Sequence, residues 1–282
     1  MKKTKIIIPA LGMLLLSTAA SISGTVAWFS MNATVSASGM QVKAKAQGGL
    51  VIANATDGTY NSSANSVKST CAELFPASTY DLSTWLTSVS TDPSQANTKQ
   101  QYTSATAWSS NESDAHYIVH DFYIRSSSAS ALTVWSVDVK SVSAQVVDPN
   151  PDDANVPAVK DLEKSLRVGV KFGTSTNSYI YGPIAGYSAS VSVQKAAGAY
   201  SSAAADRETV AALAGNTQSR DHSQTNIPNN TAEGLHAYVY VWFEGEDANC
   251  ISDNIVSDLN AIAITVEFTT TATDPNAQQN NG

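Results

Sequence analysis

The sequence predicts an all-β protein, an antiparallel β-sandwich of jelly-roll type with a few short helices and long insertions. Two observations lead to this prediction: several short segments alternate apolar and polar residues with a period of two, and helical periodicity is sparse. The chain of 282 residues is long enough to bury one core, and β-sandwiches of this size are often one domain. We therefore expect a signal peptide over residues 1–27, one domain over residues 28–270 and a disordered tail over residues 271–282.

The first 27 residues have the composition of an export signal. Three lysines in MKKTK precede the apolar stretch IIIPALGMLLLSTAA, as a charged n-region precedes an h-region. The uncharged span from Ile6 to Phe29 is long enough to cross a bilayer, so a retained anchor is the alternative. Small polar residues in its second half favour cleavage, with Ala27 as the last residue removed and Trp28 as the first residue of the mature chain. We expect a secreted protein of the extracellular matrix or cell surface.

The segment after the cleavage site predicts a strand in two parts. Apolar and polar residues alternate over residues 29–38, and the phase reverses at Gly39, after which Met40 and Val42 are apolar. One extra residue in a strand reverses the alternation, so a bulge or kink is expected there. Residues 28–38 are a candidate donor strand, which either folds into its own sheet or pairs with a neighbouring subunit. The residues assigned to this strand are Phe29, Met31, Ala33, Val35, Ala37 and Gly39.

Further strands are expected where alternation is clean or where β-forming residues cluster. The segments are residues 49–55, 115–125, 131–147, 166–172, 178–184, 237–243 and 261–268.

Helices are expected at only two places. Acidic residues and an early proline favour a short helix within residues 152–166, and a second is expected over residues 203–215, with Gly215 as its end. Two polar insertions, residues 56–114 and 185–233, are too long for ordinary loops. We expect them to carry local structure or to face a partner.

Charge and cysteine content restrict the partners. Removing residues 1–27 takes away three of the 16 basic residues and no acidic one, which leaves 13 against 24 and a net charge of −11. Such an acidic chain lacks the basic patches that nucleic acid requires. Cys71 and Cys250 are the two cysteines, and outside the cell they either form a disulfide or remain separate thiols. A disulfide closing a loop of about 180 residues would contribute up to about 5 kcal/mol in the chain-entropy model.

No motif for catalysis is present, so we expect no enzyme activity and no cofactor. His116 and His120 share a segment of strand formers, where positions four apart are about 13 Å apart and cannot hold one zinc ion. HExxH and GxSxG are absent. An acidic segment offers a weak calcium candidate, although its spacing is not that of an EF-hand and a solvated loop is the simpler interpretation. Its residues are Glu244, Glu246, Asp247 and Asp253.

The signal that ends in TVAWFS, followed by ATVSASGMQVKA, resembles the exported TasA and camelysin proteins of Gram-positive bacteria, whose signals are cut by an ER-type (SipW-dependent) signal peptidase. The match covers mainly residues 1–46, and residues 241–250 and 261–268 resemble further proteins with this signal type. The resemblance implies a secreted jelly-roll subunit of biofilm-matrix fibres, in which the N-terminal strand is lent to the next subunit.

Two other functions remain open at this point. One is a monomeric surface adhesin that recognises a host or a polysaccharide through the long insertions and their aromatic residues Trp85, Trp108 and Tyr102. The other is a camelysin-like metallopeptidase, which the missing metal-binding motif disfavours.

Overall fold

The computed structural model describes residues 41–67, 73–89, 101–107, 109, 114–146, 161–250 and 262–272. Strands dominate this part of the chain, so the predicted all-β class is confirmed. The signal peptide, the cleavage site and the donor strand predicted for residues 28–39 lie outside the described residues. Cys71, Trp108 and Asp253 also lie outside them.

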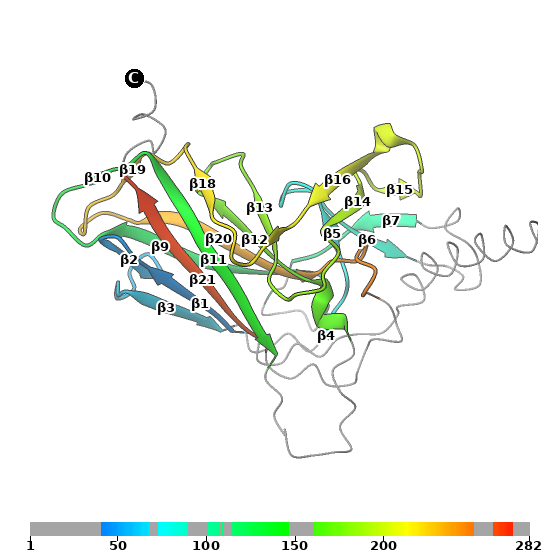
Figure 1. The fold of residues 1–282 in the computed structure, drawn as a ribbon, viewed down its shortest axis with the longest axis horizontal. Helices are drawn as coiled ribbons and strands as arrows, with labels where there is room; N and C mark the ends of the chain where they lie inside the picture. Colours follow the sequence, from blue (N-terminus) through cyan, green and yellow to red (C-terminus); the bar gives the residue numbers. More distant parts are fainter. Residues whose placement is uncertain are drawn as a thin grey trace, which may run out of the picture.

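The first main sheet has five strands in the order β18-β11-β21-β1-β3. The long strands β11 and β21 cross its centre side by side (Figure 1). Its strands are β1 (Gln41–Ala46), β3 (Ser63–Val67), β11 (Ser136–Val146), β18 (Ser219–Asp221) and β21 (Ile262–Thr271). Strand β21 thus extends one residue into the segment predicted as the tail.

The predicted antiparallel pairing is wrong for one pair of strands in this sheet. Strand β1 pairs in parallel with β21, from Gln41 beside Ala263 to Ala46 beside Phe268, and antiparallel with β3. Parallel neighbours need a long connection between them, and here most of the chain separates the two strands. The alternation of apolar and polar residues within a strand does not show whether a neighbouring strand runs parallel or antiparallel to it.

The second main sheet has six strands in the order β17-β13-β12-β20-β9-β2. They are β2 (Leu50–Ala53), β9 (Ile118–Ser126), β12 (Leu166–Phe172), β13 (Tyr179–Gly182), β17 (Leu213–Ala214) and β20 (Leu235–Phe243). Pairing is antiparallel except between β13 and β17.

One hydrophobic core joins the two main sheets. Every second residue of β9 is buried and the residues between are half-buried, which is the predicted period of two. Phe172 of β12 and Phe268 of β21 meet across the core with ring centroids 5.7 Å apart. Burial of such side chains stabilises the fold by roughly 1.5–3 kcal/mol each, so the alternation that predicted the strands also builds the core.

The two predicted insertions carry local β-structure, as expected. A four-stranded sheet, β15-β7-β6-β5, draws strands from both of them, and its labels gather at one end of the molecule in Figure 1. The remaining pairs are β14 with β16, β10 with β19 and, in parallel, β4 with β8. The strands are β4 (Glu73–Leu74), β5 (Ser78–Thr79), β6 (Trp85–Val89), β7 (Gln101–Ser104), β8 (Asp114–Ala115), β10 (Leu132–Thr133), β14 (Ser190–Gln194), β15 (Gly198–Ala199), β16 (Arg207–Ala211) and β19 (Asn226–Ile227).

The helix predicted over residues 203–215 is wrong. The chain forms the 3-10 helix η4 (Ala204–Asp206) and then enters β16, whose Val210 pairs with Val191 of β14. Strand pairing in the fold overrides the helical propensity of the alanines. In the first predicted helical segment, the described residues form only the 3-10 helix η3 (Leu162–Ser165). No helix of the described part of the chain is long and apolar enough to cross a membrane.

Candidate functional site

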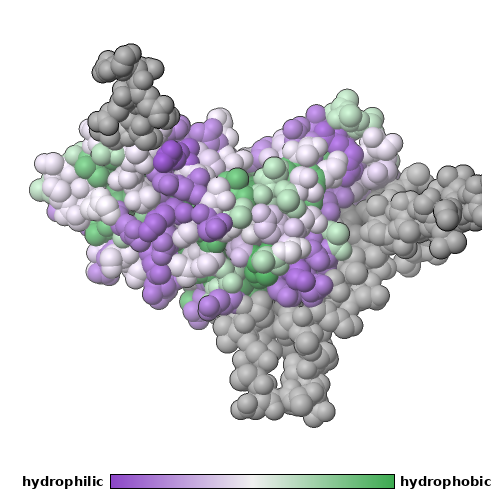
Figure 2. Space-filling model, in the orientation of Figure 1, coloured by the Kyte–Doolittle hydropathy of each residue, from purple (hydrophilic) through white to green (hydrophobic). Residues whose placement is uncertain are grey.

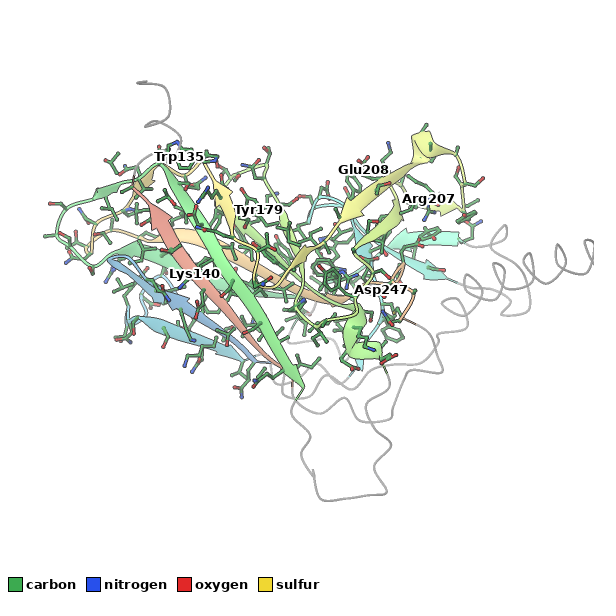
Figure 3. The ribbon with its side chains drawn as sticks, viewed as in Figure 1. Trp135, Lys140, Tyr179, Arg207, Glu208 and Asp247 are labelled. Carbon is green, nitrogen blue, oxygen red and sulfur yellow. The ribbon has the colours of Figure 1, made fainter. Side chains whose placement is uncertain are left out.

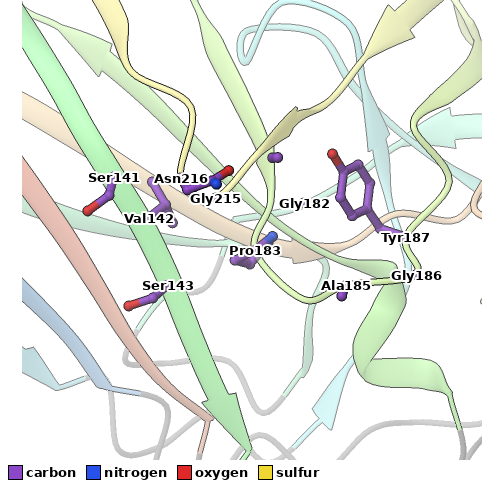
Figure 4. A pocket seen from close by; sticks show the side chains of 11 residues that line it. Ser141, Val142, Ser143, Gly182, Pro183, Ala185, Gly186, Tyr187, Gly215 and Asn216 are labelled. Carbon is purple, nitrogen blue, oxygen red and sulfur yellow. The ribbon is translucent and has the colours of Figure 1, made fainter.

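A groove of about 570 Å³ lies beside β11, between that strand and the connection that follows β13 (Figure 4). Ser143 comes from β11, Pro183 and Tyr187 from the connection, and Gly215 and Asn216 from the turn after β17. None of the 11 lining residues is charged. An uncharged lining suits a ligand without charge, because an ion would lose its hydration here without gaining a partner.

Two glycines allow the walls of this groove to approach each other. Val142 donates its N–H to the carbonyl of Gly215 at 2.7 Å, and a Cβ on Gly215 would lie 2.2 Å from the Val142 carbonyl oxygen. A Cβ on Gly182 would lie 2.3 Å from the Tyr187 ring. Only glycine fits where the backbone or a ring comes so close, so these positions determine the shape of the groove.

Within the part of the chain that the structure describes, strand β11 has an open edge along the groove. Its first part pairs with β18 up to Val139, and the register shifts at Lys140, labelled in Figure 3. Val142 then bonds to Gly215. Beyond Val142, the only neighbour of β11 in the described part of the chain is β21.

The open edge offers backbone groups for pairing. Val142 directs its N–H away from β21, and alternate residues of a strand point their N–H and C=O to the same side. Ala144 and Val146 therefore direct theirs toward the same side, and no described residue bonds to them there. An unpaired edge of this kind is a template for another strand.

The connection that forms the groove wall is held in place by the acidic segment after β20. Asp247 accepts hydrogen bonds from the buried guanidinium of Arg167 and, at 2.8 Å, from the N–H of Ser188. Asn249 Nδ2 donates to the carbonyl of Gly186 at 3.1 Å. Burial acts to raise the pKa of Asp247, but the Asn249 N–H and the Arg167 charge outweigh it and hold that pKa below its usual value. The segment is thus an anchor for the wall.

Glu244, from the same segment, is fully buried between β20 and the first insertion. Its carboxylate accepts from the Ser78 hydroxyl, from Trp242 Nε1 at 3.1 Å and from the Glu246 N–H at 3.1 Å. Desolvation raises the pKa of Glu244 to about 7, against the hydrogen bonds and the nearby Arg167 charge, which act in the opposite direction. Glu244 therefore binds the proton more tightly than a solvated carboxyl does.

The carboxylates proposed for calcium face separate protein donors. Glu246 accepts from Tyr102 at 2.9 Å and from Arg207 at 3.1 Å, while Glu244 and Asp247 have the partners given above. Calcium takes six to eight oxygen ligands at one point, and no cluster of three or more metal-binding side chains occurs within the described ranges. The candidate residues that the structure describes serve here as anchors between segments.

The other residues singled out by sequence lie apart from the groove. His120 is buried in β9 with Nδ1 3.0 Å from Ser66 Oγ, whereas His116 contacts Thr106. Trp85 and Tyr102, proposed as adhesin contacts, are only 6% and 4% exposed. That proposal is wrong for these two residues, because both rings pack in the interior. Cys250 is buried, and both alternatives for it, a disulfide to Cys71 or a separate thiol, stay predictions.

Sequence patterns did not identify the groove. Its residues are small and uncharged and come from three separate segments, so no spacing motif joins them. The one usable signal is the turn-forming pair Gly182-Pro183, at which β13 ends. Comparison with known proteins finds no family model, no curated protein and no solved structure that matches this chain.

Proposed function

We propose that the protein is a non-enzymatic secreted subunit of the bacterial cell exterior, a TasA-like jelly roll that assembles into fibres or biofilm matrix through its N-terminal strand. The supporting observation is the open edge of β11 in the sheet that the N-terminal segment enters. Gln41 of β1 and Gln145 of β11 both lie beside Ala263, so the start of β1 and the end of β11 are at the same end of the sheet.

Strand β1 is held on both sides, by β21 and by β3. The residues before it therefore start from a fixed point and need an open edge elsewhere in order to pair. Their uncharged alternating sequence is that of a strand with one buried face. Strand addition supplies main-chain hydrogen bonds without a catalytic or metal site. Homo-oligomerisation is the interaction proposed, with matrix polysaccharide and other surface proteins as further candidate partners.

Electron microscopy of the mature protein tests this function. We expect filaments from the wild-type chain and none after deletion of residues 28–38. Monomers under all conditions would favour the adhesin. Peptide hydrolysis that a chelator abolishes would instead favour a metallopeptidase.

A further inference from the structure

We propose that a row of aromatic side chains on the outer face of the six-stranded sheet binds an uncharged polysaccharide. The inference rests on the proposed function, for which matrix polysaccharide is a candidate partner, and it names the binding surface and the class of polymer. The row consists of Tyr123, His236, Tyr238, Tyr240, Tyr117 and Trp85.

Strand alternation places the row on the face that points away from the core. Every second residue of β20 from Ala237 to Val241 is fully buried, so the residues between them project from the opposite face. Tyr123 of β9 lies beside His236 in the pairing of the two strands. All members of the row except Trp85 are half-buried, so part of each of these side chains reaches solvent.

Neighbouring rings of the row pack against each other. The centroid of the His236 ring lies 4.5 Å from that of Tyr123 and 3.8 Å from that of Tyr238. The centroids of Tyr238 and Tyr240 are 6.3 Å apart, and Trp85 ends the row 5.7 Å from Tyr240. Because this packing already fixes the rings, a ligand that binds them loses little conformational entropy of the side chains.

The tyrosine hydroxyls of the row are free to bind a ligand. Those of Tyr117, Tyr123, Tyr238 and Tyr240 make no hydrogen bond within the described residues, and none of them is a buried polar atom. Burial raises the pKa of Tyr117, Tyr123 and Tyr240, so these phenols stay protonated and both donate and accept hydrogen bonds. A line of such groups matches a polymer that carries hydroxyl groups along its length.

Charge favours a neutral polymer. Asp121 and Lys171 lie on either side of Tyr238 in the strand register, and their opposite charges leave no net charge there. Each already has a protein partner: Asp121 Oδ1 lies 2.9 Å from His236 Nε2, and Lys171 Nζ donates to Ser83 Oγ at 3.1 Å. A charged polymer therefore finds no surplus of opposite charge beside the row.

The exposed surface is too small for a protein partner. A stable protein interface takes about 800 Å² from each side and is built around apolar anchors. The rings of the row are only partly exposed, and Val67 of β3 is the only exposed large apolar side chain among the described residues. A mainly hydrophilic band crosses the face of the other main sheet that carries β11 and β21 (Figure 2). A narrow row of partly exposed tyrosines suits a single polymer chain instead.

Affinity electrophoresis of the full-length mature protein tests the binding surface. Native gels containing dextran, galactomannan or hydroxyethyl cellulose supply neutral polymers, and alginate supplies an anionic one. The double variant Tyr238→Phe with Tyr240→Phe removes two hydroxyls and keeps both rings. The matched control Tyr200→Phe removes the hydroxyl of a half-buried tyrosine outside the row, which packs against Arg207.

We expect at least one neutral polymer to retard the wild-type protein and alginate to leave its mobility unchanged. The double variant should bind that polymer at least about fivefold more weakly, because two hydrogen bonds are lost. Tyr200→Phe should bind as wild type does. Circular dichroism and melting should show both variants folded, since no hydrogen bond within the described residues is removed.

Three results would overturn the inference. They are equal retardation of the wild type and the double variant, no retardation by any of the neutral polymers, and a wild-type dimer in sedimentation that the double variant dissociates, which would assign the row to a second copy. Filaments from the same preparation would leave the proposed function intact in each case. Polymer binding by a chain that never forms filaments would instead overturn the proposed function and keep the binding surface.

Discussion

The free energy of unfolding of the wild-type protein should fall as the pH rises, and replacing Glu244 with glutamine should remove that fall. Burial raises the pKa of Glu244 in the folded protein to about 7, from its ordinary value of 4.5. The folded state therefore binds a proton more tightly than the unfolded state. The stability that the protonated Glu244 carboxyl contributes is fully present at pH values below its pKa in the unfolded state. This stability is lost as the pH rises through its pKa in the folded state.

The expected size of this effect follows from the two pKa values. Each pKa unit corresponds to about 1.4 kcal/mol. Most of the pH interval between the pKa of Glu244 in the unfolded state and its pKa in the folded state lies between pH 5 and pH 8. Wild type should lose about 2–3 kcal/mol more free energy of unfolding over that interval than Glu244→Gln. At pH 5 Glu244 is protonated and already carries one hydrogen, so the variant, whose amide nitrogen carries two and accepts no hydrogen bond, should be less stable by only about 1 kcal/mol.

Urea denaturation at pH 5, 6, 7 and 8, followed by tryptophan fluorescence, measures the difference. The matched control is Glu208→Gln, since Glu208 is an exposed carboxyl on β16 (Figure 3). The control should keep the pH dependence of wild type. If Glu244→Gln also keeps it, burial of Glu244 is not the source of the pH dependence, and the reasoning is refuted.

Three further predictions concern the groove and the core. Arg167→Met leaves the buried Asp247 carboxylate without its cation and should cost about 3–5 kcal/mol in urea denaturation, so a cost below about 1 kcal/mol would contradict the ion pair. Gly215→Ala forces its Cβ against the Val142 carbonyl and should lower the melting temperature as well as filament growth; unchanged melting would contradict the close approach. Phe268→Ala opens a cavity between the main sheets and should cost about 3–5 kcal/mol, whereas a surface-like cost would show that the sheets do not share this core.

Much of the strand content was predictable because apolar side chains recur at every second position where a strand faces the core. Residues 166–172 and 237–243 alternate cleanly, and they form β12 and β20, neighbours in the six-stranded sheet. The segment at 203–215 was not predictable in the same way. Alanine favours a helix locally, and only the pairing of β16 with β14 makes that segment extended.

The sequence by itself determined the all-β class and the positions of the main strands, since a period of two is a local property of the chain. Tertiary structure alone decided which strands became neighbours, including the parallel pair β1 and β21. It also decided that Trp85 and Tyr102 are buried and that Glu244 and Asp247 face protein donors. The groove beside β11 belongs to this second group. Its residues lie far apart in sequence, and within the described residues β11 has no strand partner on that side past Val139, where its pairing with β18 ends.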